Sequence, residues 1–138
     1  MPTQSEIHAS IRKKFSNLAQ SLSLVTQYDN LPLASGVSPT EEKVWVKLAI
    51  IPGENDQKTI GDSTKVFRHT GVFIASIFAA FESGEKPIYD LVEEITHEFR
   101  SSSVDGVTYR TPSVVRVGRN DKWWQVNVTC PWFSDEIV

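Results

Sequence analysis

The sequence predicts an α+β fold: a mostly antiparallel β-sheet with two α-helices packed on one face, in the order α-β-β-α-β-β-β. Two segments repeat apolar residues at helical spacing, while several others alternate apolar and polar residues at period 2. The strands after the second helix follow one another without intervening helices, which favours antiparallel pairing. The chain has 138 residues and 40% of them are hydrophobic, enough for one domain with its own core, residues 1–138.

Two amphipathic helices are expected. The first covers residues 3–24 and begins with Thr3-Gln4-Ser5-Glu6, the pattern of a capping box. Its apolar stripe consists of Ile7, Ile11, Phe15, Leu18 and Leu22. The second begins near Pro87, because proline suits the first helical position, and ends at Arg100. Its stripe consists of Ile88, Leu91, Val92, Ile95 and Phe99.

The first strand predicted is Lys43–Ile51, in which Trp45 and Lys47 lie on the face opposite the alternating apolar residues. Trp45 is then covered either by its own chain or by another subunit. The next strand, Thr64–Phe81, is apolar on both faces in its second half, so a neighbouring subunit could supply the second cover. Gly71 is a candidate for a bulge or bend in it.

Two long connectors are expected. Residues 25–42 are rich in turn formers, and residues 52–63 are polar, with Ile60 as their lone aliphatic side chain. Such a polar loop could be a lid in an enzyme, or could become ordered when an assembly protein binds its partner.

The last third predicts a β-meander. Asp105-Gly106 is typical of a tight hairpin turn, and a short strand at Ser113–Gly118 follows the break at Thr111-Pro112. The last strand places its apolar residues on one face at period 2: Trp124, Val126, Val128, Cys130 and Trp132. Polar residues occupy its other face: Gln125, Asn127 and Thr129. This is the pattern of a strand that serves as scaffold.

Composition excludes several classes of protein. The net charge of −3 lacks the basic excess of a dedicated nucleic-acid binder. The single cysteine, Cys130, excludes an internal disulfide framework and a cysteine-cluster zinc site. The first residues do not resemble a signal peptide, and the longest apolar run, Gly71–Phe81, is too short to cross a bilayer. We therefore expect assembly in the cytoplasm and no membrane partner.

Catalytic signals are weak, so the sequence predicts no enzyme, no cofactor and no metal. Glu94 and His97 have the i, i+3 spacing of a di-metal motif, but that motif occurs once and such a site needs it twice. The sequence contains no Gly-x-Ser-x-Gly elbow and no glycine-rich phosphate motif. A small hydrolase with an acid pair remains an alternative.

A second alternative is a small nucleic-acid-binding module. Basic residues cluster with aromatic ones near the meander: Arg110, Arg116, Arg119 and Lys122 with Tyr109, Trp123 and Trp124. Such residues on a sheet could stack single strands. The acidic net charge argues against it, and no sequence-specific nucleic acid is expected as a partner.

The order of these features resembles the tail terminator proteins of long-tailed bacteriophages over nearly the whole chain. A capped helix precedes a strand ending in proline, Val44–Pro52, and then a polar loop and the Arg-x-x-Gly strand that begins Arg68-His69-Thr70-Gly71. A helix with Leu91, Ile95 and Phe99 follows. The chain then closes with the turn and strand from Gly118 through Trp124 to Val128.

The resemblance implies an α+β subunit that forms a homo-hexameric ring at the head-proximal end of the tail tube, in the virion. Such a ring stops polymerisation of the tube protein and forms the surface that joins the head-tail connector, with no covalent chemistry. A head-completion or neck adaptor protein is the alternative within the same setting.

Candidate contact residues come from the patterning of this sequence. The candidates for the interface between subunits are Trp45, Lys47, Phe73 and Ile77. The candidates for contact with the tube lie in the second polar loop: Glu54, Asp56, Lys58 and Asp62.

Overall fold

The computed structural model describes residues 4–22, 25–28, 44–57, 66–80, 86–100, 102–104, 106–120 and 123–137. Its elements are α1 (Gln4–Ser21), β1 (Val25–Tyr28), β2 (Val44–Gln57), β3 (Val66–Ala80), α2 (Lys86–Phe99), β4 (Ser103–Val104), β5 (Val107–Tyr109), β6 (Ser113–Asn120) and β7 (Trp123–Ile137). The predicted α+β class is confirmed.

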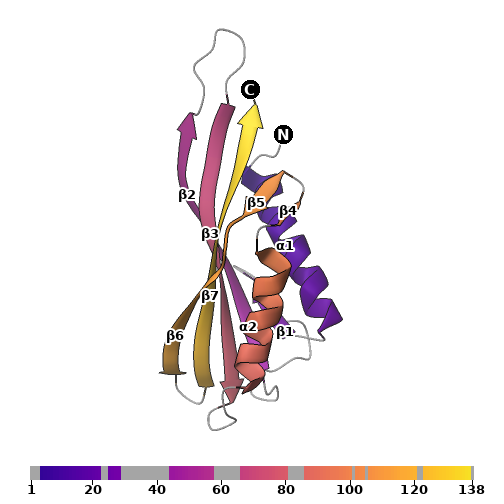
Figure 1. Ribbon diagram of the computed structural model, residues 1–138, viewed down its shortest axis with the longest axis vertical. Helices are drawn as coiled ribbons and strands as arrows, with labels where there is room; N and C mark the ends of the chain where they lie inside the picture. Colours follow the sequence, from indigo (N-terminus) through magenta and orange to yellow (C-terminus); the bar gives the residue numbers. More distant parts are fainter. Residues whose placement is uncertain are drawn as a thin grey trace.

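One seven-stranded sheet forms the body of the molecule, with the strand order β1-β2-β3-β7-β5-β4. The far edge of β7 has two partners, β6 along its first half and β5 along its second half. Every pairing is antiparallel except that of β1 with β2. Figure 1 shows a long, twisted blade of strands with α1 and α2 together on one side of it.

The strands differ from the prediction in two places. β1 lies inside the predicted connector 25–42, and β2 continues to Gln57, so residues 52–57 of the predicted polar loop are strand. β2 continues because its backbone keeps pairing with β3 at Asn55, Asp56 and Gln57. Hydrogen bonds of a β-ladder join backbone groups, so a polar sequence can extend a strand that has no apolar pattern.

Gly71 does not mark a bulge in β3. The register shift lies in the partner strand, between Pro52 and Asn55 of β2. A Cβ atom on Gly71 would lie 2.5 Å from the Trp132 ring and 2.5 Å from the Ile51 carbonyl oxygen. The glycine therefore allows a neighbouring indole and a backbone carbonyl to approach closely.

The hydrophobic core lies between the helices and one face of the sheet. The predicted helical stripes supply Ile7, Ile11, Phe15, Ile88, Val92, Ile95 and Phe99, all buried. The sheet supplies the alternating residues of its three long strands: Val46, Leu48, Phe73, Ala75, Ile77, Ala79, Val126, Val128, Cys130 and Trp132. The predicted period-2 face of β7 is thus confirmed as a core face.

The predicted Asp-Gly hairpin is also confirmed. Val104 pairs with Val107, and Gly106 adopts a φ of 80°, which glycine reaches without steric cost. The Ser134 hydroxyl, in the second half of β7, donates a 2.7 Å hydrogen bond to the Gly106 carbonyl oxygen. This bond ties the hairpin turn to the central sheet.

Candidate assembly surface

The face of the sheet that points away from the helices, here called the outer face, carries Trp45. Its indole stacks on the Phe78 ring, with centroids 4.4 Å apart, and Trp123 meets it edge-on at 6.1 Å. Trp45 is 9% exposed. Of the two predicted covers for this side chain, the structure shows the first: its own chain.

Of the other three candidates for the subunit interface, one is exposed and two are buried. Lys47 is exposed on the outer face. Phe73 and Ile77 have no exposed surface because they face the helices, where Phe73 packs against Phe15 and Phe99. Assigning these two residues to an interface was wrong: β3 is apolar on both faces, and the sequence pattern did not show which face the helices cover.

The structure describes two of the four candidates for tube contact. Glu54 and Asp56 belong to strand β2 instead of the predicted loop. Lys58 and Asp62 lie outside the described residues. The structure therefore corrects the secondary structure of the first pair and leaves the contact hypothesis as a prediction.

The described part of the chain has its largest set of exposed aliphatic side chains on β6. Val114, Val115 and Val117 are 43%, 51% and 48% exposed. Among the described strands, β6 pairs with β7 alone, so its other edge is open. An open edge presents unpaired backbone groups to another strand. Sequence reasoning found this strand but linked it only to the nucleic-acid alternative, through Arg116. Its lack of alternation, with valine at both odd and even positions, was the available signal for an exposed edge.

The middle of the outer face is polar along a row that crosses the sheet. Cross-strand partners align Gln27 of β1 with Lys47, Ser76 and Asn127, and end at Val115 of β6. The Gln125 side-chain amide donates a 2.9 Å hydrogen bond to the Asn127 side-chain oxygen. Because one row reaches from edge to edge, β1 and β6 lie at the same level along the strands.

A cation-π cluster lies on the outer face at the opposite end of the strands from Trp45. The Arg68 guanidinium donates two hydrogen bonds to the Asp135 carboxylate, of 2.8 and 3.1 Å, and lies 4.4 Å from the centre of the Phe133 ring. The Arg110 guanidinium lies 4.9 Å from the same ring centre. The two hydrogen bonds to Asp135 hold the Arg68 side chain in one orientation, so the cluster links β3 to β7.

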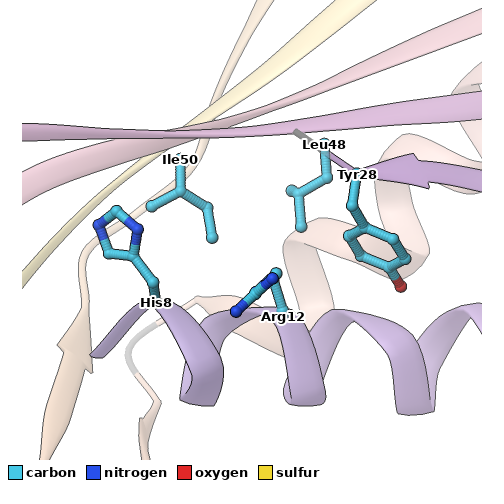
Figure 2. Close-up of a pocket in the computed structure, with 5 residues that line it drawn as sticks. All are labelled: His8, Arg12, Tyr28, Leu48 and Ile50. Atoms are coloured by element: carbon cyan, nitrogen blue, oxygen red, sulfur yellow. The ribbon is translucent and has the colours of Figure 1, made fainter. Parts of the chain in front are cut away.

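A pocket of about 190 Å³ lies between α1 and the strands β1 and β2. Figure 2 shows His8 and Arg12 of α1 opposite Leu48 and Ile50 of β2, with Tyr28 of β1 at one side. A guanidinium above an aliphatic floor suits an anion with an apolar portion. None of the described lining residues is a carboxylate or a thiol, so they supply no acid pair for hydrolysis.

Groups that could carry catalysis are dispersed in the described residues. Glu94 and His97 are exposed on α2, and no cluster of three metal-binding side chains occurs in the described ranges. Cys130 is buried in the core, and desolvation raises the pKa of its thiol from 9.0 to about 12. At neutral pH this thiol stays protonated and behaves as a small hydrophobe, as predicted.

The aromatic residues of the nucleic-acid alternative pack against other side chains of the chain. Tyr109 is 1% exposed in the core, and Trp123 meets Trp45. The Arg116 guanidinium covers the half-buried Trp124 ring at 4.9 Å from its centre. These rings do not form an open platform on which bases could stack.

No helix in the described segments is both long and apolar enough to cross a membrane.

Comparison with known proteins identifies the fold and no family. No family model matches the sequence, and no curated protein matches it. Seven chains among the solved structures are similar to it. One of them, whose name states no function, aligns over 97% of this chain and 96% of its own length, with a TM-score of 0.68 and 18% sequence identity. At this identity the likeness shows that the fold is shared over nearly the full length of both chains.

Proposed function

We propose that this chain is a structural virion protein that caps the tail tube of a long-tailed bacteriophage as a hexameric ring. The ring ends polymerisation of the tube protein and presents the surface that joins the head-tail connector. The observation that carries the proposal is the open edge strand β6 with three exposed valines, because a ring subunit needs an unpaired surface for its neighbour.

The arrangement of the sheet supports a ring over a symmetric dimer. A ring needs a head-to-tail interface, in which two different surfaces of the subunit meet. β6 and β1 are two such surfaces, because they are the outer strands at one level of the sheet and differ in sequence. The resemblance of the sequence to tail terminators supplies the expected number of six subunits and the position at the head-proximal end of the tail.

Contact with the tube is proposed for the segment that runs from the end of β2 towards β3. It contains Glu54, Asp56, Lys58 and Asp62. Charged side chains in this segment would match the charge pattern of the last tube ring and so select this partner.

Purified protein mixed with polymerising tube protein tests the proposal. We expect tubes that are shorter in proportion to the amount added, with a ring visible at one end by electron microscopy. Light scattering of the purified chain over a concentration series measures whether the ring forms before it meets the tube.

A charge-reversal pair identifies the contact. With Asp56→Lys the tubes should be longer than with the wild-type chain. Glu94→Lys, on exposed α2, is the control and should give tubes of the same length as the wild-type chain does. Tubes of unaltered length in the presence of the wild-type chain contradict the proposal. Binding to portal-side proteins without an effect on tubes would instead identify a neck adaptor.

A further inference from the structure

We propose that the ring closes by β-sheet extension, with β6 of one subunit pairing antiparallel to β1 of a second copy. This inference rests on the proposed function, because it names the surface through which the ring's subunits would join. Its occupant is another copy of this chain.

The first support is the condition of the two edges. β6 exposes Val114, Val115 and Val117 and pairs with β7 alone, and β1 pairs with β2 alone, within the described residues. Natural proteins protect long apolar edge strands with charge, proline or a covering segment. The outward edge of β6 has two arginines but no proline and no covering strand in the described structure.

The second support is that β1 and β6 lie at the same level along the strands. The row of cross-strand partners that begins at Gln27 of β1 ends at Val115 of β6. In a ring whose axis is parallel to the strands, each copy is related to the next by a rotation, with no translation along the axis. The two ends of one row therefore meet at the boundary between copies, and Val115 lies beside Gln27 of the next copy.

The third support is the direction of β6 relative to β1. β1 is parallel to β2, while β2–β3, β3–β7 and β7–β6 are antiparallel, so β6 runs opposite to β1. Rotation about an axis along the strands preserves this relation between copies. The junction is therefore an antiparallel ladder, the pattern that the rest of the sheet already follows.

Charge excludes pairing of β6 with β6 of a second copy. β6 carries Arg116 and Arg119 and no acidic residue, so a symmetric antiparallel pair would bring four guanidinium groups into one short ladder. β1 has the sequence Val25-Thr26-Gln27-Tyr28, with no charge. Pairing β6 with β1 avoids this repulsion, because β1 carries no charged residue.

The test is chemical cross-linking of the double variant Val115→Cys/Gln27→Cys with a short bismaleimide, followed by denaturing electrophoresis. The expected result is a ladder from dimer to hexamer, because every subunit donates one thiol to each neighbour. The native thiol at Cys130 is buried and protonated, so it contributes little background.

The single variants are the matched controls. Val115→Cys alone and Gln27→Cys alone should remain monomers on the gel. A dimer from Val115→Cys alone would show the symmetric β6–β6 pair and overturn the inference.

A second variant measures the association itself. Val115→Lys places a charge on the open edge and should weaken self-association by about tenfold or more, whereas Tyr89→Lys on exposed α2 should leave it unchanged. Circular dichroism verifies that both variants fold.

The failure of this inference can be told from failure of the proposed function. A hexamer by light scattering with no ladder from the double variant overturns the β6–β1 junction and leaves the ring intact. A chain that stays monomeric and gives no ladder, alone and on tube ends, overturns the junction too. Whether the chain limits tube length is decided by the separate tube assay.

Discussion

At the scale of single residues, Gly71 and Trp132 lie in close contact across two strands of the sheet. They are direct cross-strand partners, and the indole of Trp132 lies over the hydrogen of the glycine where any other residue would place a Cβ atom. Trp132 is 1% exposed and also meets His8 of α1 edge-on at 6.4 Å. The glycine therefore determines how closely α1 can approach the sheet through the tryptophan.

We predict that Gly71→Ala lowers the free energy of unfolding by about 1–3 kcal/mol, as overpacking of a core does. The new Cβ atom would lie 2.5 Å from both the Trp132 ring and a backbone oxygen, so the indole alone cannot relieve the clash. Urea denaturation measures the change. Gly53→Ala is the control, because its Cβ atom would meet Thr70 at 3.1 Å and Gly53 is exposed. Equal effects of both substitutions would contradict this explanation.

Cys130 predicts a specific dependence of stability on pH. Burial raises the pKa of its thiol to about 12 from 9.0, so the folded state favours the protonated form. The resulting stabilisation is fully present below pH 9 and is lost as the pH rises from 9 towards 12. Cys130→Ala removes this contribution, so the difference in unfolding free energy between wild type and variant should shrink over that range. A difference that stays constant up to pH 12 would argue against the thiol as its cause.

At the scale of elements, an aromatic cluster joins the two helices to the sheet. Phe99 of α2 lies 4.7 Å from Phe73 of β3, 5.0 Å from Tyr109 of β5 and 6.2 Å from Phe15 of α1, measured between ring centroids. Lys14 extends over the Phe99 ring at 5.2 Å and makes a 3.2 Å ion pair with Glu98. Four elements thus depend on one side chain near the end of α2.

We predict that Phe99→Ala lowers the free energy of unfolding by about 3–5 kcal/mol, because it removes a buried ring and leaves a cavity between both helices. Tyr89→Ala on the same helix removes an aromatic ring that is 36% exposed and should change the free energy by less than about 1 kcal/mol. Thermal unfolding followed by circular dichroism compares the two. Similar losses in both variants would contradict a special role of the aromatic cluster, because alanine has the higher helix propensity at both positions.

The elements also show where sequence reasoning succeeds. Both helices, the core face of β7 and the Asp-Gly hairpin follow from local patterns: apolar periodicity and turn chemistry. The predicted capping box involves Thr3, which lies outside the described residues. The extension of β2 through Gln57 could not be predicted in this way. Residues 54–57 read Glu-Asn-Asp-Gln, and they are strand only because β3, the next strand along the chain, supplies a partner backbone.

At the scale of the whole molecule, the two faces of the sheet have different roles. The helices α1 and α2 cover one face, which holds the hydrophobic core. The outer face carries the Trp45 cluster, a polar row and the Arg68–Phe133–Asp135 cluster. Among the described residues, the exposed aliphatic surface lies at an edge of the sheet, on β6, and not on Trp45. This is why the proposed junction uses β6.

We predict that Trp45→Ala lowers the free energy of unfolding by about 3 kcal/mol and leaves the mass of the proposed hexamer unchanged, because the indole packs against Phe78 and Trp123 of the same chain. Lys47→Ala, on the same strand and face, is the control for stability and should have little effect. Light scattering and urea denaturation measure the two properties separately. Loss of the ring in a Trp45 variant that remains folded would place this residue at the interface after all.

The sequence by itself determined the fold class, the two helical stripes, the scaffold strand at the end of the chain and the inert character of Cys130. Each of these depends on interactions between residues close in sequence or on the period of a single element. The tertiary structure alone decided that Phe73 and Ile77 belong to the core, that Trp45 is covered by its own chain and that β1 and β6 share a level. These facts depend on which strands become neighbours, and a strand's own pattern shows that it has two faces without showing what covers them.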